Sequence, residues 1–319
     1  VADVYERGAQ VLEQAIAKGT TRMRSHVEVD PRVGLRSFEA LKALKRDYAW
    51  AIDLTLCVFP QEGLTNDPGT EELLVRALQD GAEALGGCPY TDTDPHAQIA
   101  RLFALATRFD VDLDFHLDFD LDPRHTDLPA VIRETLKRNW RGRVSIGHVT
   151  NLSAMGEARI ATIAKRLAGA GIALTVLPAT DLFLNDRLVP RGVAPAHRLA
   201  QAGVVTSIAT NNVLNPFTPF GDASLVRMAN LYANVAQLSR DEDIAQVFDM
   251  VTASPARQLG AAYGLAEGGP ATVVLLDADS AKAAVREVGR VLAGWKDGVK
   301  SFDNGRSRIF RPATKGKPA

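Results

Sequence analysis

The feature that most constrains the fold is a regular alternation of short apolar segments with amphipathic helical segments. Seven segments have the length and composition of strands: residues 21–29, 52–59, 84–89, 111–119, 143–149, 172–177 and 204–210. Helical periodicity is found in residues 4–18, 34–47, 70–80, 94–109, 127–138, 156–170 and 194–202. Strands that alternate with helices predict βαβ units and a parallel sheet.

We expect this sheet to be a (β/α)8 barrel rather than an open doubly wound sheet. No glycine-rich phosphate turn follows the first strand, as a doubly wound fold would typically show. Polar residues instead lie at the C-terminal ends of successive strands, which is where the active sites of (β/α)8 barrels are built. They are His26, Glu28, Gln61, Glu62, His116, Asp118, His148, Thr180, Asp181, Asn211 and Asn212. A barrel needs eight strands, so we expect the first one to be missing, upstream of Val1.

The chain after the seventh strand has a different character. Residues 222–263 are rich in helix, and residues 271–276 and 289–298 read as strands of a more exposed type. The helix-rich stretch could pack on a second subunit or form the last helices of the barrel, which leaves a homo-oligomer open. Residues 311–319 are basic and rich in Pro and Gly, and we expect them to be disordered.

Charge and cysteine content exclude several classes of protein. The formal net charge is −1, from 37 basic and 38 acidic residues, so nothing indicates binding to nucleic acid or to an anionic membrane. No apolar run is long enough to span a bilayer, and no signal peptide is visible. Cys57 and Cys88 read as two small buried side chains, and two cysteines are compatible with a reducing cytoplasm. The expected partner is a small-molecule substrate.

The fourth predicted strand contains the run VDLDFHLDFDLD, residues 111–122. Side chains alternate between the two faces of a strand, so His116 and Asp118 should point the same way. A histidine and a carboxylate at a strand end can bind a metal and move a proton. The alternative is a histidine inside the barrel that is satisfied by Asp118, with no metal.

His148 ends the next strand, one βα unit after His116. Two histidines at the ends of adjacent parallel strands are neighbours across about one strand spacing. A lone histidine is more often structural, whereas this pair favours a metal site or an acid–base role.

Three further strand ends carry candidate substrate contacts. Gln61 in FPQEG would point a carboxamide into the mouth, where it offers a donor and an acceptor to a cyclic amide or ureide edge. Asp181 in VLPATDLFL could contact substrate or cap a turn. Asn211 and Asn212 stand where the last strand meets the mouth, and a turn favoured by Asn and Pro explains them equally well.

These motifs, in this order, resemble the cytosine deaminase-like branch of the amidohydrolase superfamily. The matching segments are TTRMRSHVEVDP (20–31), FPQEG (59–63), HLD (116–118), GHVT (147–150), VLPATDLFL (176–184) and TNNVLNPFTPFGD (210–222). The resemblance extends from residue 4 to about residue 302. It implies a (β/α)8 barrel over residues 1–265 and part of a small C-terminal β-sandwich over residues 266–310.

The resemblance also implies site roles. His116 matches a metal ligand, His148 matches a histidine that binds metal or polarises the attacking water, and Gln61 matches the glutamine that reads the pyrimidine edge. The family carries a His-x-His metal pair on its first strand, and no such pair occurs in this sequence. One divalent metal, zinc or iron, is therefore expected only when that strand is present.

The sequence departs from the family pattern at two positions. Phe119 stands where the family has a glutamate that shuttles protons, and we expect it to make the substrate pocket more apolar. Asn211 stands where the family has an aspartate that ligates the metal, and a neutral amide cannot take a proton at neutral pH. Asp118 or Asp120 would then have to carry the proton.

Three hypotheses follow from the sequence. The first is a metal-dependent hydrolase of non-peptide C–N bonds, a deaminase or cyclic amidohydrolase, that acts on a small heterocyclic substrate. The second is a metal-free hydrolase on the same barrel that uses His148 and Asp118 as acid and base. The third is a non-catalytic homologue that binds a small molecule.

Overall fold

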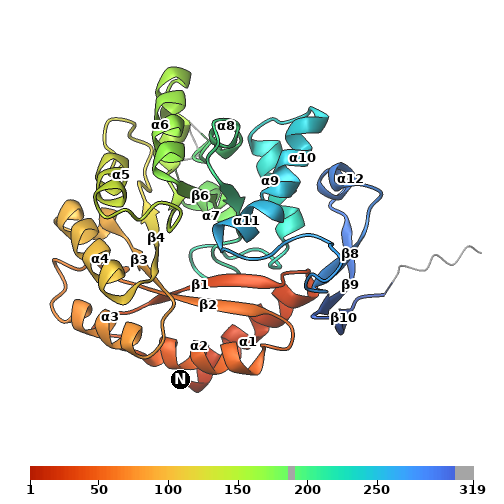
Figure 1. Ribbon diagram of the computed structural model, residues 1–319, viewed down its shortest axis with the longest axis horizontal. Coiled ribbons are helices and arrows are strands. Elements are labelled where there is room, and N and C mark those ends of the chain that lie inside the picture. The colour runs from red at the N-terminus through yellow and green to blue at the C-terminus, as the bar shows by residue number, and fades with distance from the viewer. Residues whose placement is uncertain (186–190, 306–319) are drawn as a thin grey trace, which may run out of the picture.

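The structure, a computed structural model, describes residues 1–185 and 191–305 (Figure 1). It contains the seven strands that the sequence predicts. They are β1 (Arg22–Glu28), β2 (Asp53–Phe59), β3 (Ala84–Gly87), β4 (Asp112–Leu117), β5 (Val144–His148), β6 (Ile172–Val176) and β7 (Thr206–Ile208). Each strand pairs in parallel with the next one along the chain, in the order β1-β2-β3-β4-β5-β6-β7.

Helices connect these strands and cover the outside of the sheet (Figure 1). The α-helices of this part are α1 (Ala2–Ala17), α2 (Arg36–Asp47), α3 (Thr70–Gln79), α4 (Pro95–Phe109), α5 (Leu128–Lys137), α6 (Glu157–Ala170), α7 (Pro178–Leu184), α8 (Ala196–Gln201), α9 (Leu225–Val235), α10 (Asp241–Asp249) and α11 (Ala253–Gln258). Two 3₁₀ turns, η1 (Pro89–Thr91) and η2 (Thr150–Ala154), follow β3 and β5. The helix-rich stretch predicted after the seventh strand is thus α9, α10 and α11.

The seven strands curl into a partial (β/α) barrel, which confirms the predicted fold class. Within the described residues, β1 and β7 are the edges of this sheet, since each pairs with a single neighbour. An eighth parallel strand between β7 and β1 would close the barrel. The strand that the sequence analysis expects upstream of Val1 would fit in this gap.

The two faces of the strands differ in chemistry. The outward face is apolar and packs on the helices, as Phe115 of β4 does against Phe103 of α4, with ring centroids 5.9 Å apart. The inward face of β4 carries Asp114 and His116, one strand period apart. Polar side chains therefore line the inside of the barrel, where branched apolar residues are usual.

A second, antiparallel sheet follows the barrel in the order β10-β9-β8. It consists of β8 (Val273–Asp277), β9 (Arg290–Lys296) and β10 (Val299–Asp303), with helix α12 (Ala281–Arg286) between β8 and β9. This sheet corresponds to the predicted sandwich part, whereas α12 was not predicted. Lys296 Nζ lies 2.8 Å from Asp53 Oδ1 at the start of β2, so the small sheet is tied to the barrel. The disordered tail predicted for residues 311–319 lies outside the described residues.

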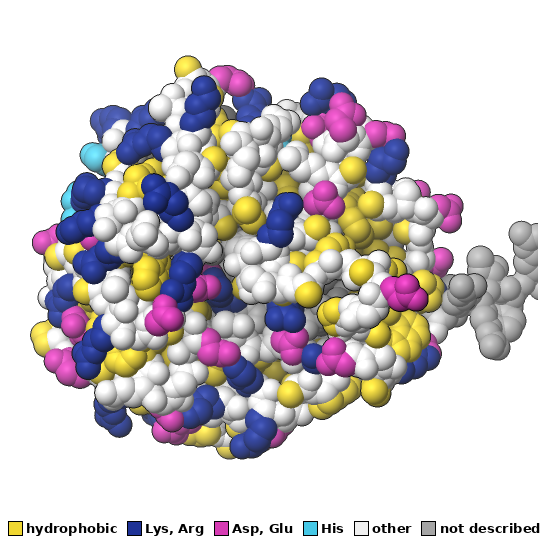
Figure 2. All heavy atoms as spheres, viewed as in Figure 1, with side chains coloured by type: hydrophobic (Ala, Val, Ile, Leu, Met, Phe, Trp, Pro, Cys, Tyr) yellow, Lys and Arg dark blue, Asp and Glu magenta, His cyan; other side chains and the backbone are white. Residues whose placement is uncertain are grey.

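The distribution of charged side chains on the surface agrees with the near-neutral net charge of the chain. Figure 2 shows basic and acidic side chains interspersed over one face of the molecule. None of the helices formed by residues 1–185 and 191–305 combines the length and apolar character needed to cross a membrane. Cys57 and Cys88 are both free and buried, as predicted.

Candidate active site

The candidate site lies at the carboxyl ends of the barrel strands, where three backbone positions are strained. Asp118 after β4, His148 at the end of β5 and Asn211 after β7 have φ values of 49°, 67° and 56°. Left-handed conformations of residues other than glycine cost about 1–3 kcal/mol each and concentrate at functional sites. All three were predicted as site residues, and the strain favours a function for these strand ends.

His116 lies in a cluster of aromatic rings. Its ring stacks on Phe59 at 5.0 Å and 8°, meets the edge of His26 at 4.7 Å and lies 5.2 Å from the ring of His148. Burial, together with the nearby His26 and His148, holds the pKa of His116 well below its usual value. Its buried Nδ1 has no hydrogen-bond partner in the described structure. A neutral imidazole with an unpaired nitrogen is suited to accept a proton or to bind an electrophile.

His148 and Asp181 form a buried pair that the sequence did not anticipate. Nδ1 of His148 lies 2.6 Å from Oδ1 of Asp181, and the two side chains are 3% and 0% exposed. Burial raises the pKa of Asp181, and His148 opposes that rise. The carboxylate also accepts a bond from the backbone NH of Leu177, at 3.3 Å. Asp181 thus orients the imidazole through Nδ1 and leaves Nε2 for chemistry.

Asp118 does not share the surroundings of His116, contrary to the prediction from strand alternation. Strand β4 ends at Leu117, and the positive φ of Asp118 breaks the alternation there. Its carboxylate accepts bonds from the hydroxyl of Thr126 and, at 2.9 Å, from the backbone NH of Asp127, just before α5. Burial raises the pKa of Asp118 to about 6, a value suited to proton transfer near neutral pH. A catalytic role for Asp118 therefore stays a prediction, without the strand-phase argument.

Asp120 is exposed and takes part in a local turn. Its Oδ1 accepts a bond from the backbone NH of Asp122 at 2.7 Å, and its carbonyl accepts one from Thr150 Oγ1 at 2.8 Å. These contacts explain the residue without catalysis, and its predicted role as a proton carrier stays untested.

Phe119 follows β4 and Gln61 follows β2, and both contact residues that come directly after β3. The Phe119 ring meets His148 edge-on at 4.7 Å and lies 6.0 Å from the ring of Tyr90, in η1. Gln61 donates from Nε2 to Cys88 Sγ at 3.4 Å. The sequence analysis did not select Tyr90 or Cys88, although their position directly after β3 is the signal that could have found them.

The loop that carries Gln61 is held by Asp92. The carboxylate of Asp92 accepts bonds from the backbone NH groups of Leu64 (2.6 Å) and Thr65 (3.0 Å) and from Gln98 Nε2 (2.8 Å). Burial opposes ionisation, but the hydrogen bonds from Thr65 and from backbone NH groups outweigh it and lower the pKa of Asp92 to about 2. The ionised carboxylate is therefore part of the folded loop.

We expect this network to make stability depend on pH in the acid range. A depressed pKa in the folded state stabilises the fold above the unfolded value, 3.8, and that contribution is lost as the pH falls through about 2. Between pH 5 and pH 2 the wild type should lose about 2 kcal/mol more unfolding free energy than Asp92→Asn. Urea unfolding at each pH measures this difference, and Thr65→Val should remove part of it. Parallel pH curves for wild type and D92N would contradict the assignment.

The two asparagines after β7 differ in what surrounds them. Asn212 Oδ1 accepts a bond from Asn215 Nδ2 at 2.6 Å, and Asn215 Oδ1 accepts from the backbone NH of Thr218 at 3.1 Å. Asn212 therefore belongs to a turn, the alternative that the sequence left open, and a substrate contact for it is untested. Asn211 has the strained backbone described above, and its predicted place as a metal ligand is likewise untested.

The described side chains do not by themselves fit a metal centre. Among residues 1–185 and 191–305, no three His, Cys, Asp or Glu side chains are grouped so that they could hold an ion. Asn211 supplies a neutral amide where the family pattern has a carboxylate. The unpaired Nδ1 of His116 is the feature that favours a ligand here. Further donors would have to come from a strand in the gap between β7 and β1.

The protein family to which this chain belongs follows from its match to a family model. The family described as "Amidohydrolase family" matches residues 5–302, nearly the whole described length. The chain belongs to the amidohydrolase family. This confirms the resemblance drawn from the motifs, since solved amidohydrolases and deaminases share its fold throughout.

Several amidohydrolase and deaminase relatives are similar to this chain. A pterin deaminase of Rhizobium rhizogenes (strain K84 / ATCC BAA-868) is 31% identical over 287 residues, which cover 87% of this chain and 64% of that protein. The 5-methylcytosine deaminase of Klebsiella pneumoniae, liganded with 5-fluorocytosine, has a TM-score of 0.93 and 28% identity, over 98% of this chain and 78% of that one. The N-isopropylammelide isopropylaminohydrolase of Burkholderia multivorans ATCC 17616 has a TM-score of 0.84 and 29% identity, over 92% and 74%. The chain thus spans just under two thirds of the pterin deaminase.

Proposed function

We propose that this chain is the catalytic body of a hydrolase that cleaves a non-peptide C–N bond of a small heterocyclic substrate, as a deaminase or a cyclic amidohydrolase. The observation that carries the proposal is the buried His148–Asp181 pair beside His116, at the carboxyl ends of the barrel strands. The names of the similar proteins, which include pterin, 5-methylcytosine and N-isopropylammelide hydrolases, support a nitrogen heterocycle as the substrate.

The reaction needs one proton moved from water to the leaving nitrogen. Asp181 accepts the Nδ1 proton of His148, so Nε2 is free to take a proton as water adds to the ring carbon. The same Nε2–H then donates to the nitrogen as the C–N bond breaks, and ammonia or an amine leaves. Phe119 and Tyr90 would line the ring-binding side, and Gln61 would read the polar edge of the ring.

We also propose that one divalent ion, zinc or iron, assists the hydrolysis, with His116 as its ligand in this chain. Such an ion would lower the pKa of a bound water toward about 7. The incomplete donor set and Asn211 favour a second candidate, a metal-free hydrolase in which the His148–Asp181 pair is the acid–base system. Asp118, with its pKa near 6, is the alternative proton carrier in either case.

Two measurements test these proposals: the metal content and the turnover of the protein that contains this chain. The protein is purified without chelator. Ammonia or amine release is measured with an aminopyrimidine, a pterin and an N-alkylamino-triazine. We expect release from at least one of them and about one equivalent of zinc or iron per chain. Turnover without metal would support the metal-free hydrolase. Neither metal nor turnover would overturn the proposed function and leave a small-molecule binder. A cytoplasmic location and a homo-oligomer stay predictions from the sequence.

A further inference from the structure

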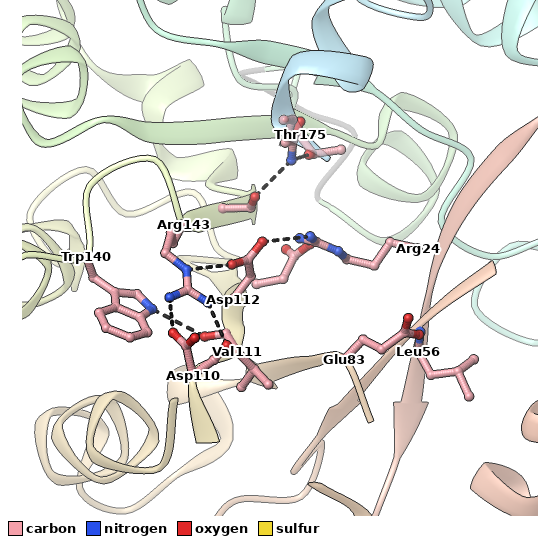
Figure 3. A network of polar contacts seen from close by, with 12 residues as sticks. Arg24, Leu56, Glu83, Asp110, Val111, Asp112, Trp140, Arg143 and Thr175 are labelled. Carbon is pink, nitrogen blue, oxygen red and sulfur yellow. Dashed lines mark hydrogen bonds and ion pairs between the residues drawn. The ribbon is translucent and has the colours of Figure 1, made fainter. Parts of the chain in front are cut away.

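A buried ion pair crosses the inside of the barrel below the candidate site. Arg24 of β1 donates from Nη1 to Oδ2 of Asp114 in β4 at 3.0 Å, and the two side chains are 9% and 11% exposed. Strands β2 and β3 separate β1 from β4 in the sheet, so the pair bridges the interior rather than neighbouring strands. Figure 3 shows Arg24 reaching across toward β4, where Asp112 also lies.

The second oxygen of Asp114 faces a histidine. Oδ1 lies 3.7 Å from Nε2 of His26. This nitrogen is buried and has no hydrogen-bond partner in the described structure, although the His26 side chain as a whole is 25% exposed. A neutral imidazole carries one ring proton, and Nε2 is the ring nitrogen of His26 that faces this carboxylate. A small approach of the two groups would complete a hydrogen bond from Nε2–H to the carboxylate.

The ring of His26 in turn contacts His116. The two rings meet edge to face, with centroids 4.7 Å apart and an angle of 89°. Phe59 stacks on the same His116 ring and also meets His26 edge-on, at 5.6 Å. The orientation of His116 therefore depends on the position of the His26 ring, because a closely packed ring limits the orientations that its neighbour can adopt.

We infer that Arg24, Asp114 and His26 form a positioning column beneath His116. Arg24 fixes the carboxylate of Asp114. That carboxylate faces Nε2 of His26 and would accept its proton after a small approach, and the His26 ring held in this way packs on His116 at the mouth. These are positioning residues, since each is argued to act on His116 through its neighbour in the column. The predicted tautomer of His26 does not depend on the proposed function. Only the benefit of the column to catalysis rests on that function.

The tautomer of His26 tests the column directly. Long-range proton–nitrogen NMR spectra of protein labelled with ¹⁵N-histidine distinguish a protonated from an unprotonated ring nitrogen, and His26→Gln assigns the signals. In the wild type at pH 7.5 we expect the proton on Nε2. In Asp114→Asn the amide oxygen must face Arg24, which has only donors, so the NH₂ group faces His26. Nε2 then has to accept, and the proton should move to Nδ1.

A matched control separates this effect from a general change of charge. Asp112→Asn removes a carboxylate that lies 3.6 Å from Arg24 Nη2, and it should leave the His26 proton on Nε2. Two results would overturn the column: a wild-type His26 protonated on Nδ1, or an unchanged tautomer in a D114N variant whose circular dichroism is that of the wild type. A wild-type spectrum with the proton on Nδ1 would overturn the column even if D114N does not fold. Because no substrate is involved, failure of this test leaves the hydrolase proposal standing, and the reverse also holds.

Discussion

Replacing Asp181 by asparagine (D181N) should lower kcat for C–N hydrolysis about 10²–10⁴-fold, with KM changed only a few-fold. The carboxylate accepts the Nδ1 proton of His148 in a site where both side chains are buried. An asparagine amide can turn its NH₂ group toward Nδ1, which favours the tautomer with the proton on Nε2. That nitrogen could then no longer take a proton from water. The loss should therefore appear in the chemical step rather than in binding.

The decrease of kcat is measured by steady-state kinetics of ammonia release. The substrate is the heterocycle that the panel described above identifies. Asp3→Asn is the control, because its carboxylate is exposed and bonds to Arg7 within helix α1, away from the site. Asp118→Asn compares the two proposed proton carriers. A D181N enzyme with wild-type kcat would contradict the acid–base role of the pair, and full activity in D118N would exclude Asp118 as the proton shuttle.

Replacing Asp114 by alanine (D114A) should destabilise the folded chain by about 3–5 kcal/mol. This is the usual cost of leaving one partner of a buried ion pair without its counter-charge. Arg24 would keep only Asp112, at 3.6 Å and partly exposed, as a nearby carboxylate. Within the described residues its Nε is already buried without a hydrogen-bond partner, so the barrel interior there offers the guanidinium little other compensation.

Urea denaturation followed by circular dichroism measures the difference in unfolding free energy. Arg24→Met combined with D114A should be less destabilising than the sum of the two single variants, since the double variant buries no unpaired charge. Arg7→Met is the control, because its ion pair with Asp3 is exposed and should contribute little to the unfolding free energy. Additive losses for Arg24 and Asp114 would contradict a direct interaction between them.

Much of the candidate site could be predicted from local pattern. His116 and His148 were assigned to the ends of adjacent strands, and the structure places their rings 5.2 Å apart. The prediction for Asp118 used the same alternation and was wrong in its geometry, because β4 ends one residue before it. A strand period holds only while the backbone stays extended, and nothing in the run DFHLDFD marks the residue at which φ becomes positive.

The sequence by itself determined the order of seven strands, the partial barrel and the family, and it selected the candidate site histidines. These follow from periodicity and from motifs, which are properties of short segments. The tertiary structure alone decided that Asp181 is the partner of His148 and that Arg24 reaches Asp114. Those pairs join residues 33 and 90 positions apart, and their contact depends on how the strands curl around a common interior. Contacts between such distant segments decide which side chains lie close enough to form hydrogen bonds inside the barrel.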